Sequence, residues 1–316
     1  MFLIRFLLLL LLPVAALAAP KTAPAPTTPA VTGPAMWEIK TDTAKVTLFG
    51  TVHTLPRDVD WFRPHVVAAV DSADLVVLET LPPDSYMAVA PMIERLARLP
   101  QPHALLLRLP AAQRGPLVEA LARLKPPPLE RYETWYVALT LANMQAAEYG
   151  FDPRIGAEAV LAARARIRQK PLHGLETMEE QLINFDALPE SDQVQLLLTT
   201  LDDLSGSKQR MEYMVKAWVD GDIDWLARQM NRAFSGSPML KRMLMDDRNE
   251  RWAAWIARKI QTEPQHLFVA VGAGHLGGAG NLIEILGRYG LEAKLVTPPV
   301  GATGARRQAR QNVSKK

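Results

Sequence analysis

Cysteine is absent from the 316-residue chain. Disulfide bonds, thiol catalysis and cysteine-ligated zinc are therefore excluded. The sequence also lacks an H-E-x-x-H motif, which excludes the helical zinc site of common metalloproteases, and a G-x-S-x-G motif, which excludes the nucleophile turn of α/β-hydrolases. Hydrolytic chemistry in this chain would have to use histidines and carboxylates in a different arrangement.

A basic surface is also missing from the body of the chain, although the net charge is +3. Positive charge is concentrated at the two ends, where Arg5 and Lys21 lie near the start and residues 301–316 carry basic side chains and no acidic ones. The remaining sequence is mildly acidic. Because binding to a phosphate backbone needs a cluster of Lys and Arg, nucleic acid is not an expected partner.

Apolar runs long enough to cross a membrane are missing as well. The apolar block at residues 6–12 follows Arg5 and leads into Ala16-Leu17-Ala18, the small-x-small pattern of a signal-peptidase site. This block is shorter than the about 20 residues that a membrane-spanning helix needs. We therefore expect a cleaved signal peptide over residues 1–18, a periplasmic or secreted protein, and no integral membrane span after cleavage. An uncleaved anchor is the alternative.

Composition and periodicity divide the rest of the chain. Residues 19–35 are rich in Pro, Ala and Thr and indicate a linker, whereas residues 301–316 have no apolar periodicity and indicate a disordered tail. Buried-strand patterns lie near both ends of residues 36–300, and helical periodicity fills the region between them. We predict one domain of the α/β (α+β) class, with a central mixed sheet formed from N- and C-terminal segments and a largely helical middle region.

Two G-x-x-H sequences bracket this domain, and each follows a predicted strand. They end on His53 and His275, while Glu79 and Glu176 follow two other predicted strands. Ligands collect outside the carboxyl ends of strands in open α/β sheets, so these side chains would meet if the terminal segments pair in one sheet. Each glycine is expected to let the chain turn sharply and to let a ligand approach the backbone.

Two imidazoles with one or two carboxylates are a ligand set for a divalent transition ion. Such an ion would activate water and polarise a carbonyl, and a spare glutamate could act as general base. Histidines that only stabilise the fold are the simpler alternative. A third interpretation is the dinucleotide fingerprint G-x-G-x-x-G at residues 272–277, but its acidic partner should end the next strand, and Glu292 precedes it. The other histidines are expected to be surface residues or local hydrogen-bonding groups: His65, His103, His173 and His266.

Five segments resemble the TraB/GumN family, also called pheromone-shutdown or Tiki-like. The resemblance extends from Trp37 to Val300. The segments that resemble the family are LFGTVH at 48–53, LVVLE at 75–79, GLETMEEQL at 174–182, RNERW at 248–252 and VAVGAGHLGGAGNLIEIL at 269–286.

This resemblance implies a metal-dependent peptidase, because the animal members of the family are such enzymes and favour manganese or cobalt. It implies His53, His275 and Glu79 as metal ligands, with manganese, cobalt or zinc as the ion. Glu79, Glu176 and Arg248 are the implied catalytic groups. The chain departs from the family at residues 156–158, where Gly-Ala-Glu replaces the usual Gly-x-Asp and leaves the role of Glu158 open.

The expected function is an exported metal-dependent hydrolase that acts on an amide bond, with a peptide or small-molecule substrate. A non-catalytic periplasmic protein that binds or sequesters a peptide or another exported ligand is the alternative. The two differ in whether bound ligand is turned over and whether a metal is needed.

Overall fold

The computed structural model describes residues 33–83, 86–204, 206, 208–234, 236–262 and 265–296. The predicted signal peptide, the linker up to residue 32 and the C-terminal tail lie outside this range. In the part of the chain that is described, no helix has both the length and the apolar character needed to span a membrane.

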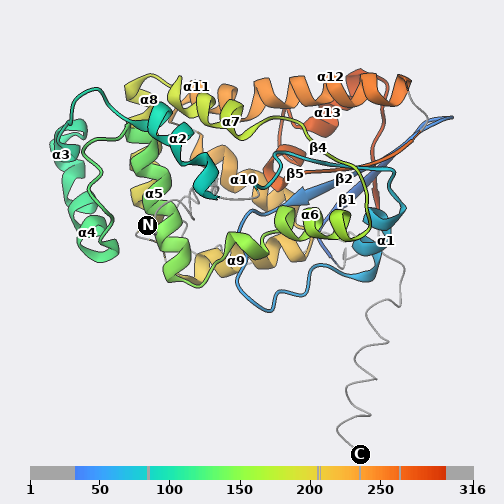
Figure 1. The fold of residues 1–316 in the computed structure, drawn as a ribbon, viewed down its shortest axis with the longest axis horizontal. Coiled ribbons are helices and arrows are strands. Elements are labelled where there is room, and N and C mark those ends of the chain that lie inside the picture. The colour runs from blue at the N-terminus through green and yellow to red at the C-terminus, as the bar shows by residue number, and fades with distance from the viewer. Residues whose placement is uncertain are drawn as a thin grey trace, which may run out of the picture.

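A six-stranded mixed sheet forms the centre of the molecule (Figure 1). Its strand order is β4-β3-β5-β2-β1-β6, in which β4, β3, β5 and β2 are parallel and β1 and β6 complete one edge by antiparallel pairing. The strands are β1 (Met36–Lys40), β2 (Lys45–Thr51), β3 (Leu75–Leu78), β4 (Leu172–Gly174), β5 (His266–Gly272) and β6 (Lys294–Val296). The predicted sheet of N- and C-terminal segments is therefore confirmed.

Helices cover both faces of the sheet. Because neighbouring residues of a strand point to opposite sides, each central strand contributes side chains to both layers. Leu48 and Val269 pack under α12 (Asp247–Thr262) and α13 (Leu282–Arg288), which lie above the sheet in Figure 1. Phe49 and Phe268 face the other side, where α1 (Pro64–Ser72), α6 (Ala157–Ile167) and α9 (Lys208–Val219) pack. The central strand β3 is apolar throughout and β5 is apolar from Leu267 to Val271, because both faces of these strands are buried.

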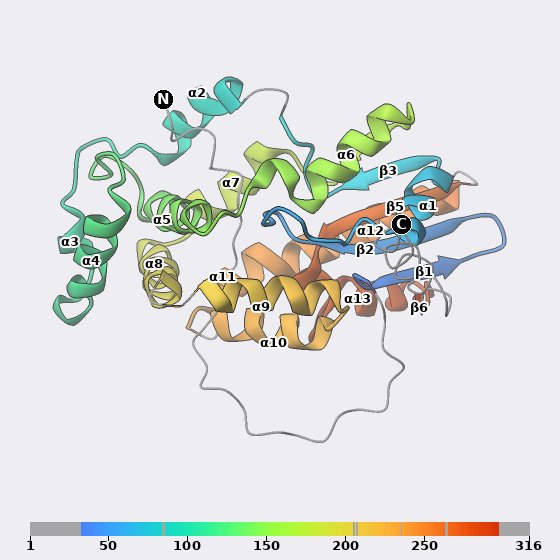
Figure 2. The ribbon, with the colours of Figure 1, turned by 90° about the horizontal axis from the view of Figure 1, so that it is seen from below.

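The helical middle region has a core of its own. Figures 1 and 2 both place α4 (Arg114–Leu124), α5 (Thr134–Glu148) and α8 (Glu190–Leu204) at the end of the molecule away from the sheet. Trp135, Phe185 and Leu197 are buried at the centre of this second core. Its main helices are α2 (Tyr86–Ala97), α4 (Arg114–Leu124), α5 (Thr134–Glu148), α7 (Met178–Asp186) and α8 (Glu190–Leu204), with the short α3 (Leu105–Arg108) beside them.

Local contacts mark several helix boundaries in the middle of the chain. α5 begins at Thr134, and just before it the guanidinium of Arg108 binds the carbonyls of Glu130 and Tyr132. α12 is preceded by α11 (Pro238–Lys241) and a π-helical segment, η4 (Arg242–Asp246). Gly221, with φ +78°, lies between α9 and α10 (Ile223–Ala233).

Candidate functional site

The two G-x-x-H sequences lie side by side at one edge of the sheet. Strands β2 and β5 are parallel neighbours, with Gly50 opposite Val271 and Thr51 opposite Gly272. Glu79 follows β3, where its backbone N donates to the Ala270 carbonyl across 3.0 Å. Four parallel strands therefore deliver their following polar residues to the same carboxyl edge.

Three of these side chains converge at Gly272. A methyl group built on this glycine would lie 3.4 Å from Glu79 Oε2, 3.5 Å from His275 Cδ2 and 3.7 Å from His53 Nε2. Glu79 is fixed there because Gly272 donates its backbone N–H to Glu79 Oε2. The glycine thus leaves open the space that the two imidazoles and the carboxylate share.

The turn expected at the two motif glycines is found only at Gly272, which ends β5 and precedes a short 3-10 helix, Ala273–Leu276. Gly50 lies inside β2, and neither glycine has positive φ. What they permit is close approach. A methyl group on Gly50 would lie 3.1 Å from the Cα of Ala273, closer than most side-chain contacts, so the first motif packs directly on the backbone of the second.

Arg248 lies between the two glutamates. Its guanidinium forms ion pairs with Glu79 and Glu176, and its Nε donates to Glu176 Oε2 across 3.0 Å. Arg248 and Glu79 are 3% and 2% exposed, so these charges are paired away from water. Gln181 donates to Glu79 Oε1 from α7, across 2.8 Å. The sheet edge, α7 and α12 are joined through this network.

His275 is held on three sides. Its Nδ1 lies 2.7 Å from Asn249 Oδ1, and its Nε2 lies 3.3 Å from Nη1 of Arg248. The ring also packs on Trp252, with 4.6 Å between the ring centroids. Arg248, Asn249 and Trp252 all come from the first turns of α12, which therefore fixes the second motif histidine.

His53 has a carboxylate partner. Its Nδ1 lies 2.7 Å from Glu158 Oε1, and the hydroxyl of Thr51 donates to the same oxygen. Glu158 is close to the start of α6, where Gly156 brings the chain against His53: a methyl group on Gly156 would lie 2.0 Å from the His53 carbonyl oxygen. The role of Glu158 that the sequence left open is therefore a contact with His53.

The surroundings of the two glutamates shift their pKa values in opposite directions. Burial raises the pKa of Glu79, but the opposite charge of Arg248 and the two histidines outweigh burial and lower that pKa. Burial also raises the pKa of Glu176, and in this case Arg248 does not cancel the effect. Glu79 is therefore held as a carboxylate, whereas Glu176 binds a proton more readily than an exposed glutamate.

The two histidines differ as well. Burial alone would lower the pKa of His53, but Glu158 and Glu79 raise it to about 9. Burial and the neighbouring Arg248 lower the pKa of His275 to about 3. Near neutral pH the site without a bound ion therefore contains one charged and one neutral imidazole.

The side chains of the site are not close enough to one another to form a metal-binding group as they stand. Among the residues that are described, no three His, Asp or Glu side chains lie in a group that could hold an ion. His53, Glu79 and His275 face a common point, but Arg248 occupies the contact with Glu79. The metal-ligand expectation for these three residues stays a prediction.

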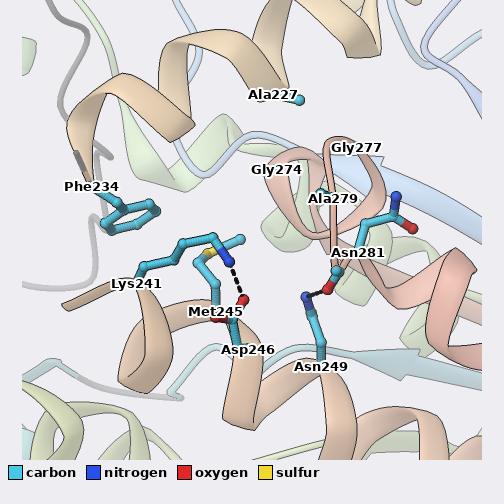
Figure 3. Close-up of a pocket in the computed structure, with 11 residues that line it drawn as sticks. Ala227, Phe234, Lys241, Met245, Asp246, Asn249, Gly274, Gly277, Ala279 and Asn281 are labelled. Carbon is cyan, nitrogen blue, oxygen red and sulfur yellow. Dashed lines mark hydrogen bonds and ion pairs between the residues drawn. The ribbon is translucent and has the colours of Figure 1, made fainter. Parts of the chain in front are cut away.

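A pocket lies beside the second motif (Figure 3). It lies between the loop that follows β5 and the segment leading into α12. Lys241 forms an ion pair with Asp246 at its edge, and Asn249 donates from Nδ2 to the Gly280 carbonyl across 3.1 Å. Asn249 therefore contacts both the pocket loop and His275.

Two histidines outside the site, His173 and His266, contact residues near them. His173 stacks on Trp255 with 4.6 Å between centroids, and His266 contacts Thr47 and the Ser72 carbonyl. These contacts agree with the expectation of local roles for these two.

Sequence reasoning missed three residues of the site: Gln181, Asn249 and Trp252. All three fall inside segments that carried the family resemblance, so those segments were the available signal. Residue type and spacing could not reveal their contacts, because these depend on how α7 and α12 pack against the sheet edge.

Comparison with known proteins identifies relatives and a family. The chain is 27% identical over 241 residues to YbaP of Escherichia coli strain K12, an alignment that covers 76% of this chain and 86% of YbaP. YbaP of Shigella flexneri matches to the same extent. Both relatives are described as uncharacterized proteins. The sequence pattern of the TraB/PrgY/gumN family matches residues 35–294, and the chain therefore belongs to the TraB/PrgY/gumN family.

Proposed function

We propose that this chain is an exported, metal-dependent hydrolase that cleaves an amide bond, with His53, His275 and Glu79 as ligands of a divalent transition ion. The observation that carries the proposal is the convergence of these three side chains at Gly272. Two histidines and a carboxylate are the ligand set of many hydrolytic metal sites. Manganese, cobalt and zinc are the candidate ions.

The donor chemistry fits such an ion. Each histidine has an oxygen partner at Nδ1, Glu158 for His53 and Asn249 for His275, so each can present Nε2 as a ligand. Metal-binding histidines commonly have this second hydrogen bond, which fixes the ring. Because Arg248 contacts Glu79 and also lies 3.3 Å from Nε2 of His275, ion binding requires that these side chains adjust.

A bound ion would supply polarisation of the scissile carbonyl and activation of a water molecule. The residues of the chain would act around that chemistry. Arg248 holds Glu79 and Glu176 in fixed orientation, and its guanidinium is suited to stabilise negative charge that develops on a substrate oxygen. Glu176, whose pKa burial raises, is suited to exchange a proton with the substrate.

The decisive experiment measures metal content and hydrolysis together. The mature protein is purified without chelator, and metal is quantified by elemental mass spectrometry. Wild type is expected to hold about one equivalent, and His53→Ala/His275→Ala to hold none, because both imidazole ligands are gone. Peptide hydrolysis is then assayed with manganese, cobalt and zinc. His173→Ala is the matched control, since it removes a histidine that stacks on Trp255 outside the site.

Unchanged metal content and hydrolysis in the double variant would contradict the proposal. Peptide binding without turnover, surviving chelator treatment, would instead support the non-catalytic binding protein. That alternative has one feature in its favour, since the buried ion pairs of Arg248 already satisfy both glutamates.

A further inference from the structure

Asn249 is buried with both ends of its amide bonded. Its Nδ2 donates to the Gly280 carbonyl across 3.1 Å, and its Oδ1 lies 2.7 Å from His275 Nδ1. Figure 3 shows the first of these contacts reaching the loop that follows β5. One side chain thus connects α12, this loop and the second motif histidine.

The direction of the amide follows from chemistry. A backbone carbonyl can only accept a hydrogen bond, so the NH₂ end of Asn249 must face Gly280. The amide oxygen then faces His275, and this oxygen can also only accept. His275 Nδ1 must therefore carry a proton, and in the neutral ring the lone pair lies on Nε2.

The His275 ring lies with one edge toward the space at Gly272. The Cδ2 atom of His275, which is bonded to Nε2, faces the shared space at Gly272. Arg248 Nη1, a donor, lies on the Nε2 side at 3.3 Å, a longer contact than the one to Asn249. Nε2 is therefore the nitrogen with the electron pair, which Arg248 Nη1 approaches as a donor in the absence of an ion.

We propose that Asn249 is a positioning residue that fixes the tautomer and ring plane of His275, using the Gly280 carbonyl as its anchor. The inference rests on the proposed function for its catalytic meaning, because a lone pair on Nε2 is what a metal ligand needs. The hydrogen-bond geometry itself does not depend on that function.

The loop is shaped to provide the anchor. Gly280 has φ +74° and Gly278 has φ +77°, a backbone conformation that side chains disfavour. Asn281 follows and caps α13, accepting from the Glu284 N–H across 2.9 Å. Asn249 and Asn281 thus offer a matched pair: both contact this loop, but only Asn249 contacts His275.

The test reads the proton position directly. Long-range ¹H–¹⁵N correlation spectra of the imidazoles are recorded for the metal-free, mature protein near neutral pH. The chain has six histidines, and the spectrum of His275→Ala identifies the signal of His275. Wild type is expected to show the proton on Nδ1 alone. Asn249→Ala is expected to show an Nε2–H population, because the Asn249 oxygen that accepts from Nδ1–H is then absent.

Two further variants complete the design. Asn249→Asp keeps an acceptor at this position and is expected to keep the proton on Nδ1. Asn281→Ala is expected to leave the tautomer unchanged, although it removes a helix cap. In titrations with manganese or zinc, Asn249→Ala is expected to bind about 10-fold to 100-fold more weakly than wild type, the usual effect of losing such a partner.

The proposal is overturned if wild type has the proton on Nε2, if Asn249→Ala keeps the single Nδ1–H form, or if Asn249→Asp loses it. A different result would overturn the proposed function alone. If the tautomer changes as expected but wild type binds no metal and cleaves no peptide, Asn249 positions His275 for another purpose.

Discussion

Gly272 donates its backbone N–H to Glu79 Oε2, with 2.9 Å between the two atoms. This bond joins the end of β5 to the residue that follows β3. It also brings the carboxylate to the one residue around which both motif histidines converge. The absence of a side chain at position 272 is therefore a feature of the site itself.

Gly272→Ala is expected to separate stability from function. The added methyl group would meet its neighbours at 3.4 to 3.7 Å, ordinary contact distances, and φ is −47°, which alanine adopts readily. The free energy of unfolding should change by no more than about 1 kcal/mol. Metal content and hydrolysis should fall strongly, because the methyl group fills the shared space.

Gly287→Ala is the control for this variant, since no atom lies within 4 Å of the added methyl group on α13. Thermal unfolding and elemental analysis of both variants check the prediction. Full metal content in Gly272→Ala would show that the ion, if any, binds elsewhere.

Gly156→Ala is expected to be far more damaging to the fold. The new methyl group would lie 2.0 Å from the His53 carbonyl oxygen and 2.6 Å from its carbon, and backbone atoms cannot rotate away. We expect a loss of about 1–3 kcal/mol or more in the free energy of unfolding, the range typical of overpacking. Gly115→Ala, with no atom within 4 Å, is the matched control in urea denaturation. Equal midpoints for the two variants would contradict the close approach of residue 156 to His53.

The sequence predicted the parts of the site that depend on strand ends. An apolar run followed by a polar residue marked His53, Glu79 and His275, and the structure brings these three to one edge of one sheet. Apolar strands buried on both faces leave few places for a charged side chain other than the carboxyl end. That physical constraint is why the placement of these residues could be predicted without knowledge of the contacts, whereas their role as metal ligands stays a prediction.

The sequence could not predict contacts made across the packing of separate elements. Asn249 and Gln181 reach the site only because α12 and α7 lie over the carboxyl edge, and nothing in their own segments specifies that position. The misreading of Gly50 has a similar cause. A glycine needed for close approach looks the same in sequence as one needed for a turn, and at Gly50 only the contact with Ala273 distinguishes the two roles.

Glu158 is expected to affect metal affinity through His53. Glu158→Ala removes the oxygen that lies 2.7 Å from His53 Nδ1, so the ring loses its fixed orientation. Affinity for manganese or zinc should fall about 10-fold to 100-fold, and Glu158→Gln should fall less because its amide oxygen can still accept. Calorimetric titration measures both. Glu250→Ala, which removes an exposed ion pair with Arg288, should bind metal as wild type does. A Glu158→Ala protein with wild-type affinity would refute the role of this carboxylate.

Asp71 provides a prediction about pH that does not involve the site. Hydrogen bonds from Arg164 and Arg168 of the α6 region lower the pKa of this carboxyl on α1 below its ordinary value of 3.8. A depressed folded-state pKa stabilises the protein above the pKa of the unfolded chain, and this contribution is lost as the pH falls through the folded-state value. Wild type should therefore exceed Asp71→Asn in stability at pH 6, by up to about 1 kcal/mol for such a surface pair. The difference should shrink below pH ~4. A difference that persists at pH 2 to 3 in thermal unfolding would point to packing instead of charge.

Arg248 and Arg251 offer the sharpest comparison, because both come from α12 and both approach Glu176. Arg248 is buried between two glutamates, whereas the side chain of Arg251 is 54% exposed and lies 3.9 Å from Glu176. Arg248→Met leaves two carboxylates buried without their counter-charge, and we expect it to lower the free energy of unfolding by about 3–5 kcal/mol. Arg251→Met should change it by less than about 0.5 kcal/mol.

Adding Glu176→Gln to Arg248→Met tests the reason for that loss. If uncompensated charge is the cause, removing one of the two carboxylates should restore at least about 1 kcal/mol of the free energy of unfolding. The effects of substitutions within one ion-pair network are not additive. Urea denaturation of the two single variants and the double variant measures this coupling. Additive losses would mean that the Arg248 side chain stabilises the fold through packing on Trp252, which its guanidinium contacts at 4.6 Å from the ring centroid. Recovery would establish that the charge of Arg248 is what allows two carboxylates to remain buried beside the motif histidines.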